Sequence, residues 1–149
     1  MSMTATARPV DGGLQHEVDV NGRHTIITDE PTALGGTDYG PAPHELLAAS
    51  LAACVSTMIV TYANARDLDV SELSVDVEYD QTATPRKVRV VVHAPAHFTA
   101  EQLERLHRIA DGCPVKRALE AGFSFEETVL PQPSPELRLL VAGRPNRDT

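Results

Sequence analysis

The sequence has no tryptophan, only two cysteines and few aromatic side chains, which make up 4% of its 149 residues. Two cysteines are too few for a disulfide scaffold or for a zinc site with four cysteine ligands. Cationic residues are scarce too, since 13 Lys and Arg stand against 21 Asp and Glu and leave a net charge of −8. Such a chain repels the phosphates of nucleic acids, so we expect no nucleic-acid partner.

Long hydrophobic runs are absent as well. The longest apolar stretch, from Leu46 to Val60, is interrupted by hydroxyl side chains and is shorter than the roughly 20 residues that span a bilayer, so we expect no membrane partner. Residues 1–13 hold no apolar segment of the secretory type, which favours a cytoplasmic location. The hydrophobic fraction of 42% and the charged fraction of 23% are typical of a globular protein.

The length predicts a single domain, which we place at residues 1–130, with residues 131–149 as a proline-rich C-terminal extension. Short segments of alternating or β-branched residues predict two groups of antiparallel strands and one late strand. These strands are expected at residues 4–9, 14–20, 23–28, 73–80, 87–93 and 123–129, with a further candidate at 137–141. Between the second and third strands, Asn21-Gly22 predicts a tight hairpin turn.

An uninterrupted run rich in Ala and Leu, from His44 to Arg66, predicts the longest helix. Its apolar residues point in several directions, and such a helix is buried on most sides. A chain of this length has difficulty surrounding the helix alone, so we expect a homodimer in which a second subunit covers it. Small side chains would let another helix approach closely; they are Ala48, Ala49, Ser50, Ala52 and Ala53.

Two shorter helices are expected after the second group of strands. Thr99 and Gln102 form the capping-box pattern and predict a helix that ends near residue 111. Pro114 is typical of a first helical position and predicts the start of another. Before the long helix, residues 29–43 form a loop with three prolines and three glycines. Loops of this length are usually functional or clamped by a partner.

The two cysteines are the candidates for chemistry. Cys54 lies within the long helix, where a lone cysteine is usually a small core residue, and this interpretation stays open. Cys113 directly precedes Pro114, and at a helix start the dipole and the free N–H groups favour a thiolate. Together the two residues suggest an attacking thiolate and a resolving partner. Their spacing of 59 residues excludes C-x-x-C chemistry.

Attack on a peroxide also needs a cation that holds the thiolate and polarises the peroxide oxygens. Arg23, after the Asn-Gly turn, is one candidate, although a hairpin arginine is more often a surface residue. Arg66 lies about 18 Å along the helix from Cys54 and cannot serve it. Glu45 lies on the opposite face from Cys54, about 13.5 Å away along the axis. It could therefore meet only the Cys54 of a second subunit, or it could simply complement the helix dipole.

Two stretches carry a resemblance to a known family. The segment DEPTALGGTDYGPAPHELLAASLAACVSTM, followed by IADGCPVKRALEAGFSFEE, is similar to the OsmC-like and organic hydroperoxide resistance (Ohr) superfamily over residues 14–129. The resemblance implies an α+β fold, in which antiparallel sheets wrap long central helices in an intertwined homodimer with active sites at the interface. It also implies a peroxidatic Cys54, a resolving Cys113, an intramolecular disulfide between them and a cellular dithiol as reductant.

The resemblance further matches Arg23 and Glu45 to an Arg and a Glu that peroxidase members employ. In the well-studied peroxidase subgroups that Glu directly follows a Pro and lies ten residues before the Cys, a place that His44 holds here. The Pro-x-Glu-Leu-Leu pattern of this chain is closer to a less characterised OsmC-like subgroup. His44 could partner Arg23, stabilise a thiolate when protonated, or be a capping or surface residue.

The function we expect is that of a cysteine-based, peroxiredoxin-like peroxidase that reduces organic hydroperoxides in oxidative-stress defence, with no cofactor and no metal. Apolar residues around Cys54 favour an organic over a hydrophilic peroxide. One alternative is a non-enzymatic module that binds an apolar ligand or senses redox state. Another is a metal site of Cys54, Cys113 and a histidine such as His44 or His107, although this spacing matches no closed zinc pattern.

Overall fold

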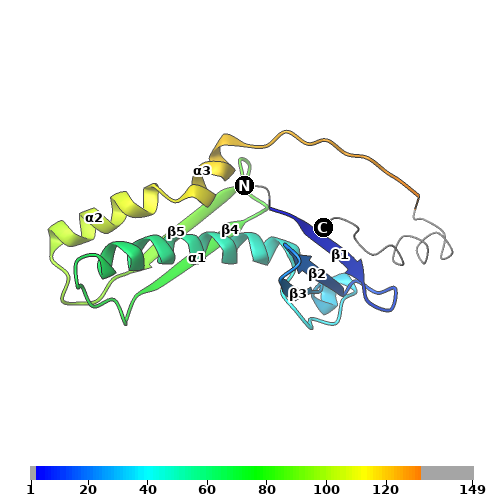
Figure 1. The fold of residues 1–149 in the computed structure, drawn as a ribbon, viewed down its shortest axis with the longest axis horizontal. Coiled ribbons are helices and arrows are strands. Elements are labelled where there is room, and N and C mark those ends of the chain that lie inside the picture. The colour runs from blue at the N-terminus through cyan, green and yellow to red at the C-terminus, as the bar shows by residue number, and fades with distance from the viewer. Residues whose placement is uncertain (1–2, 132–149) are drawn as a thin grey trace, which may run out of the picture.

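The computed structural model describes residues 3–131 and shows a mixed α and β protein with two separate antiparallel sheets (Figure 1). The predicted α+β class is therefore confirmed. The elements are β1 (Ala5–Pro9), β2 (His16–Val20), β3 (His24–Thr28), a short 3-10 turn η1 (Thr32–Leu34), α1 (Pro43–Asn64), β4 (Ser74–Asp80), β5 (Lys87–His93), α2 (Ala100–Asp111) and α3 (Pro114–Ala121).

The N-terminal sheet has the strand order β1-β2-β3, with every neighbouring pair antiparallel. The predicted Asn-Gly hairpin is confirmed, since Asn21 and Gly22 adopt φ angles of 55° and 64° and the turn closes between the Arg23 N–H and the Val20 carbonyl. Because directly opposed residues share a face, Val18 and Ile26 lie on the same side of the sheet. No described helix covers that side, and Ile26 stays 37% exposed.

The long loop between β3 and α1 is closed by one carboxylate. Asp29 is 1% exposed and accepts hydrogen bonds from the N–H groups of Glu30, Thr37 and Tyr39 and from the Thr37 hydroxyl. Its own N–H donates to the carbonyl of Pro41, two residues before α1 begins. The length of this loop predicted that it is functional or held by a partner. Here Asp29 of the same chain holds the loop and attaches the start of α1 to the end of β3.

Helix α1 has the predicted place and length, but it buries only one stripe of side chains. The buried residues recur at every fourth position and are Leu51, Val55, Ile59 and Ala63. The other positions, including Ala49 and Ala53, are half-buried or exposed. The expected burial on most sides is therefore not achieved within the described part of one chain. With 22 residues, α1 is long and apolar enough to cross a membrane, a test that core helices of soluble proteins also pass.

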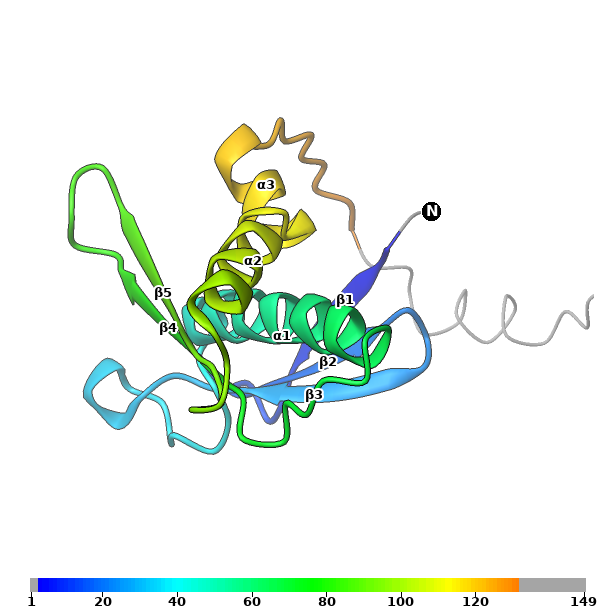
Figure 2. The same ribbon diagram turned by 90° about the vertical axis from the view of Figure 1, so that its left-hand side faces the viewer.

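The second sheet is the hairpin of β4 and β5, which packs against α1. Every second residue of β4 is half-buried, so the strand turns one apolar face toward α1, as its alternation predicted. Figures 1 and 2 show α2 alongside α1, with the β4–β5 hairpin on another side of the helix and the N-terminal sheet toward one end. The core where these elements meet consists of Leu51, Val55, Ile59, Phe98, Leu106 and Cys113.

Helices α2 and α3 begin and end as the sequence predicts. The Thr99 hydroxyl accepts from the Gln102 N–H, and the Gln102 side chain accepts from the Thr99 N–H, which completes the capping box. Helix α3 has Pro114 at its first position, and it ends at Gly122, whose φ of 75° favours glycine. The position of the Gly112-Cys113 turn between the two helices is therefore determined by residues close to it in the sequence.

The expected strand at residues 123–129 does not form within the described chain. Residues 122–131 have no regular secondary structure, and Phe123 and Phe125 are 63% and 80% exposed. Figure 1 shows this segment leaving α3 along the outside of the molecule. A strand needs a partner edge for its backbone hydrogen bonds, and no described strand offers one here. The candidate strand at 137–141 lies outside the described residues, as does nearly all of the proposed extension.

Candidate active site around the two cysteines

The structure brings Cys54 and Cys113 together from elements 59 positions apart in the sequence. Cys54 lies in the middle of α1 and is half-buried, whereas Cys113 is the N-cap of α3 and is fully buried. Both residues are free thiols, Cys54 packs against the core cluster that contains Cys113, and Cys113 is close enough to raise the pKa of Cys54. The fold thus brings the two cysteines to one region of the core, where α1 packs against α3.

The surroundings of Cys54 oppose its ionisation. Burial raises the pKa of the Cys54 thiol above its ordinary value, and the neighbouring Cys113 thiol raises it further. One contact acts in the opposite direction, because the backbone N–H of Val115, in the first turn of α3, donates to the Cys54 sulfur and lowers the pKa. Within residues 3–131, the start of α3 thus supplies the one group that lowers the pKa of Cys54.

The turn that carries Cys113 is closed by an ion pair. Lys116 Nζ lies 2.7 Å from Asp111 Oδ1 at the end of α2, and 3.9 Å from Glu120 Oε1 one turn further along α3. The hydrogen bond that the Lys116 ammonium donates to Asp111 is the largest cause that raises the pKa of Lys116, and the Cys113 sulfur contributes in the same direction. A positive charge is therefore held close to the buried member of the cysteine pair.

The environment of the pair is otherwise apolar. Leu51 and Val55 of α1 are 3% and 1% exposed, and Met58, Ile109 and Val115 pack against the same core cluster as Cys54. Apolar walls of this kind accommodate a hydrocarbon group better than a hydrated one, because contact with them removes apolar surface from water.

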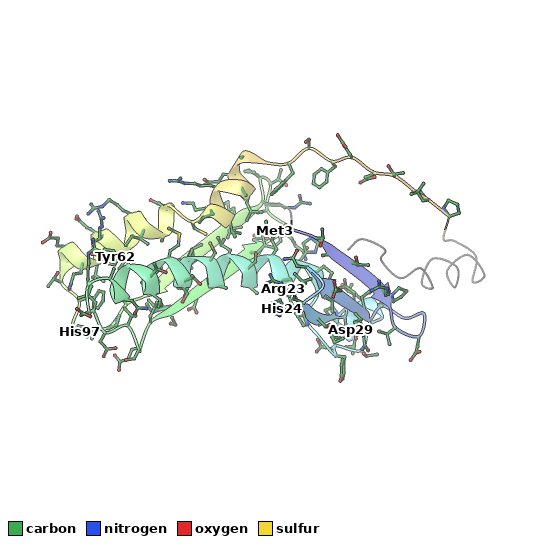
Figure 3. The ribbon with its side chains drawn as sticks, viewed as in Figure 1. Met3, Arg23, His24, Asp29, Tyr62 and His97 are labelled. Carbon is green, nitrogen blue, oxygen red and sulfur yellow. The ribbon has the colours of Figure 1, made fainter. Side chains whose placement is uncertain are left out.

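Arg23 lies at the β2–β3 turn and is exposed. The groups that shift the Cys54 pKa do not include it. Figure 3 shows Arg23, His24 and Asp29 on the side of the molecule formed by the N-terminal sheet, whereas Tyr62 and His97 lie at the other end. Within one described chain, the structure does not assemble the predicted cation with the predicted thiolate.

Glu45 and His44 lie in the first turn of α1, nine and ten residues before Cys54. The Glu45 carboxylate accepts a hydrogen bond from the Ala42 N–H at 2.8 Å and so caps the helix, a contact that the sequence analysis did not predict. The His44 ring lies 5.9 Å from the Tyr79 ring of β4. Since α1 is continuous, neither side chain reaches the Cys54 of its own chain.

Across residues 3–131, no three His, Cys, Asp or Glu side chains converge as metal ligands. His107 lies 3.6 Å from Asp111 instead of joining the cysteines. The alternative of a metal site built from Cys54, Cys113 and a histidine is therefore contradicted for the described part of the chain.

Two contributors to this site escaped the sequence analysis, and so did Asp29, the carboxylate that organises the loop before α1. The Val115 N–H is a backbone group and has no signature of its own. Lys116 does have a sequence signature, because it follows the helix-capping Cys113 by three residues and residues at this spacing are neighbours on a helix. Asp29 is eight residues from Thr37, and no local pattern announces a carboxylate that organises a loop.

The comparisons with known proteins agree on one family. Residues 35–128 match the profile of a family described as OsmC-like protein, whereas no curated protein matches the sequence. Similar solved structures include an osmotic stress and detoxification response protein of Psychrobacter arcticus, with 26% identity, a TM-score of 0.66 and coverage of 78% of this chain and 87% of that one.

Two further structures are of organic hydroperoxide resistance proteins. The OsmC protein of Legionella pneumophila has 28% identity and a TM-score of 0.59 over 80% of this chain and 89% of its own. The protein of Elizabethkingia anophelis has 26% identity and a TM-score of 0.56 over 78% of this chain and 86% of its own. These structural matches span most of each chain, and the family profile over residues 35–128 includes both cysteines.

Proposed function

The chain belongs to the OsmC-like protein family, and from this premise we propose that it is a thiol-dependent peroxidase that reduces organic hydroperoxides. The observation that carries the proposal is that Cys54 and Cys113 are neighbours in the core, where α1 meets the first turn of α3. A nucleophilic thiol with a second thiol at contact distance is what a two-cysteine peroxidase needs. The related organic hydroperoxide resistance proteins support the substrate class.

The more accessible sulfur acts first in this proposal. Cys54 is half-buried, so a small peroxide can reach it, whereas Cys113 is fully buried behind it. The Cys54 thiolate attacks one peroxide oxygen, the O–O bond breaks, and Cys54 becomes a sulfenic acid while the alkoxide leaves and takes up a proton as the alcohol. Cys113 then attacks the Cys54 sulfur, and the disulfide forms with release of water. The apolar walls provided by Leu51 and Val55 favour peroxides with a hydrocarbon group.

Regeneration requires two electrons from outside the chain. A cellular dithiol would attack the Cys54–Cys113 disulfide through a mixed disulfide and leave as its own disulfide, with both protein thiols restored. Thiol reductants of this kind are maintained in the cytoplasm, which is where we place the protein. No metal and no cofactor takes part in this scheme.

The proposal includes a homodimer. Burial raises the Cys54 pKa, and the chain's own Arg23 does not counteract it, so the required cation must come from elsewhere. Outside its buried stripe, α1 presents small and apolar side chains such as Ala49 and Ala53, and the N-terminal sheet leaves Val18 and Ile26 without a covering element. A second copy that covers these surfaces would bring its own Arg23 hairpin to the thiol pair.

Two cysteine variants test the chemistry directly. Peroxide consumption with a dithiol reductant should vanish in Cys54→Ser, because a hydroxyl cannot replace the nucleophile. Cys113→Ser should stop after one equivalent of peroxide and leave a sulfenic acid on Cys54, detected with a sulfenic-acid trapping reagent and peptide mass spectrometry. Full turnover in Cys54→Ser, or no trapped sulfenic acid in Cys113→Ser, would contradict the assignment.

One observation favours a second candidate function. The raised pKa of Cys54 lowers its thiolate fraction in a single chain, so its reaction with peroxide is slow. A slowly reacting thiol suits a redox-sensing module that is oxidised once, at a high peroxide level. Such a module would form the disulfide without sustained peroxide consumption. Measuring many turnovers with excess dithiol and peroxide separates the two functions, because only the peroxidase consumes more than one equivalent per chain.

A further inference from the structure

Met58 places a third sulfur in the region of the two cysteines. It lies four residues after Cys54 on α1, and residues at this spacing are neighbours on one side of a helix. Its side chain is half-buried and packs against the core cluster that contains Cys113. Met3, the other methionine of the described chain, lies in the N-terminal segment and is 83% exposed. Within residues 3–131, Met58 is therefore the thioether that lies beside Cys54.

The methyl end of Met58 lies against the turn that carries Cys113. A Cβ atom added to Gly112 would be 3.5 Å from Met58 Cε, which is an ordinary packing distance. The φ angle of Gly112 is −78°, so the backbone conformation does not require a glycine here. The missing side chain instead gives the Met58 methyl group room to lie over the turn. Met58 thus packs between the helix that carries Cys54 and the residue bonded to Cys113.

We propose that Met58 is a site of sulfoxidation by hydroperoxides, and that its sulfoxide moves the Cys113 turn away from α1 and so disfavours the Cys54–Cys113 disulfide. The inference rests on the proposed peroxidase function for its oxidant. It adds to that function a way in which excess peroxide limits the cycle. Val55, three residues before Met58 on the same side of α1, contributes an apolar wall that attracts an organic hydroperoxide.

The thioether reacts by oxygen transfer. A lone pair of the Met58 sulfur attacks the outer oxygen of the hydroperoxide, an S–O bond forms and the O–O bond breaks. The alkoxide takes the proton of the transferred hydroxyl and leaves as the alcohol, so the sulfur is oxidised by two electrons and the peroxide is reduced by two. The product is a polar, chiral sulfoxide, and its reversal needs a methionine sulfoxide reductase. The modification therefore outlasts the catalytic cycle.

The surroundings of Met58 suit a thioether better than a sulfoxide. The core cluster beside it consists of apolar side chains and the thiol of Cys113, which is only a weak donor. A polar oxygen buried without a partner costs free energy. Movement of Gly112 away from Met58 lets the oxygen reach water, and the same movement carries Cys113 away from Cys54. Closing the disulfide then requires the turn to return and the oxygen to be buried again.

The first test measures which methionine is oxidised. Cys54→Ser protein, which forms no internal disulfide, is treated with equal concentrations of cumene hydroperoxide or hydrogen peroxide, and peptide mass spectrometry measures the sulfoxide at Met58 and Met3. Met3 is the internal control because it is exposed to both oxidants. We expect the ratio of Met58 to Met3 oxidation to be at least about threefold higher with cumene hydroperoxide, because apolar walls attract the apolar oxidant. Equal ratios, or no sulfoxide at Met58, would overturn the proposed site.

The second test measures what the sulfoxide does to the disulfide. A glutathione redox buffer, with no peroxide present, gives the effective concentration of the two thiols from the ratio of dithiol to disulfide. The disulfide form is first treated with cumene hydroperoxide, which leaves the cysteines protected, and the oxidant is removed. We expect the effective concentration to fall roughly tenfold after treatment, since burial of an unpaired polar group shifts an equilibrium by about this factor.

Two substitutions at Met58 bracket the effect. Met58→Leu lacks the sulfur and keeps an apolar side chain of similar volume, so its effective concentration should be the same before and after treatment. Met58→Gln carries a permanent polar oxygen and should have a lowered effective concentration without any peroxide, whereas Met3→Gln should not. If Met58→Gln fails to fold, the treated parent protein decides the question. An unchanged effective concentration in parent protein oxidised at Met58 would overturn the proposed effect on the disulfide.

The two proposals fail in distinguishable ways. If the parent consumes no more than one equivalent of peroxide with excess dithiol, but its Met58 sulfoxide forms and lowers the effective concentration, the peroxidase function is wrong and the inference for Met58 stands. If the parent sustains peroxide consumption, and during long exposure loses activity no faster than Met58→Leu, the inference for Met58 is wrong and the peroxidase function stands.

Discussion

At Cys54, burial and ionisation work against each other. The contacts that place its sulfur against Cys113 also raise its pKa, and one N–H group from Val115 offsets only part of this effect. A cysteine with an ordinary pKa of about 8.5 is only about 3% thiolate at pH 7, and Cys54 in a single chain is below that. The proposed peroxidase therefore needs further positive charge near Cys54, which our proposal assigns to Arg23 of a second copy.

Replacement of Arg23 tests where that charge originates. In Arg23→Ala we expect the pH profile of Cys54 alkylation to move to higher pH and peroxide consumption at pH 7 to fall by about tenfold or more, because a cation near a thiolate lowers the thiol pKa by at least one unit. Peptide-resolved alkylation across a pH series measures the first effect. An unchanged profile would assign the role to another cation. Arg8→Ala, in exposed strand β1, is the control.

At Asp29, a charged side chain holds the loop between β3 and α1 in place. Its carboxylate accepts four hydrogen bonds from the loop, which lower its pKa. Asn retains one oxygen and places an NH₂ group where a donor already points. We therefore expect Asp29→Asn to lower Tm by several degrees at pH 7 and to speed proteolysis within residues 30–41. Thermal melting and limited proteolysis measure the two effects.

The pH dependence of this effect has a defined sign. Because the folded-state pKa of Asp29 is lowered, its contribution to stability is complete above the unfolded value of about 3.9 and is lost as pH falls through the folded value. The Tm difference between Asp29→Asn and the parent should therefore shrink below about pH 4. Asp38→Asn is the control, since Asp38 is exposed and its positive φ of 57° suits asparagine. A difference that persists undiminished at pH 3 would contradict this account.

Among the elements, the first turn of α1 carries Glu45, for which the structure gives a capping contact and the family resemblance a second role. Glu45 caps the helix through the Ala42 N–H, whereas the family resemblance gives it a part in catalysis. Glu45→Ala should lower the free energy of unfolding by about 1 kcal/mol, because it removes this hydrogen bond. Glu45→Gln keeps an acceptor oxygen and should stay close to the parent in denaturant unfolding.

The two Glu45 variants also separate capping from catalysis. If the charge of Glu45 acts on a thiolate or on an arginine across the interface, Glu45→Gln should lose peroxide consumption while it remains stable. If Glu45 only caps α1, Glu45→Gln should consume peroxide at the parent rate. Steady-state peroxide assays with the dithiol reductant decide between these outcomes.

For the whole molecule, we expect a homodimer in which α1 is the shared core. Light scattering coupled to gel filtration should give twice the chain mass at micromolar concentration. Ala49→Lys should dissociate this dimer, because Ala49 lies outside the buried stripe of α1 and a long charged side chain there would block close helix approach. Within one chain the same lysine pairs with Glu45 four residues earlier, which favours the helix.

The control for Ala49→Lys is the same Ala→Lys change at a position outside α1. Ala118→Lys introduces the same side chain on exposed α3 and should leave the mass unchanged. A parent protein that stays at single-chain mass at all concentrations, with a Tm that does not depend on concentration, would contradict the dimer. Loss of peroxide consumption in parallel with dissociation of Ala49→Lys would place the completed site at the interface.

Local chemistry explains why the sequence predicted the elements so closely. The Asn21-Gly22 turn, the capping box of Thr99 and Gln102, and Pro114 each act within a few residues, so their outcome hardly depends on the rest of the fold. The alternation in β4 and the length of α1 are likewise readable along the chain. The candidate cysteines follow from residue type together with the family resemblance.

Tertiary structure decided what depends on segments distant in the sequence. Only the packing of α1 against α3 brings Cys54 to Cys113 and aims the Val115 N–H at its sulfur, and only the folded loop gives Asp29 its partners. Residues 123–129 have the composition of a strand, but no edge in the described chain pairs with them. Hydrogen bonds and pKa shifts require atoms within a few ångströms, and sequence spacing does not reveal which distant residues come that close.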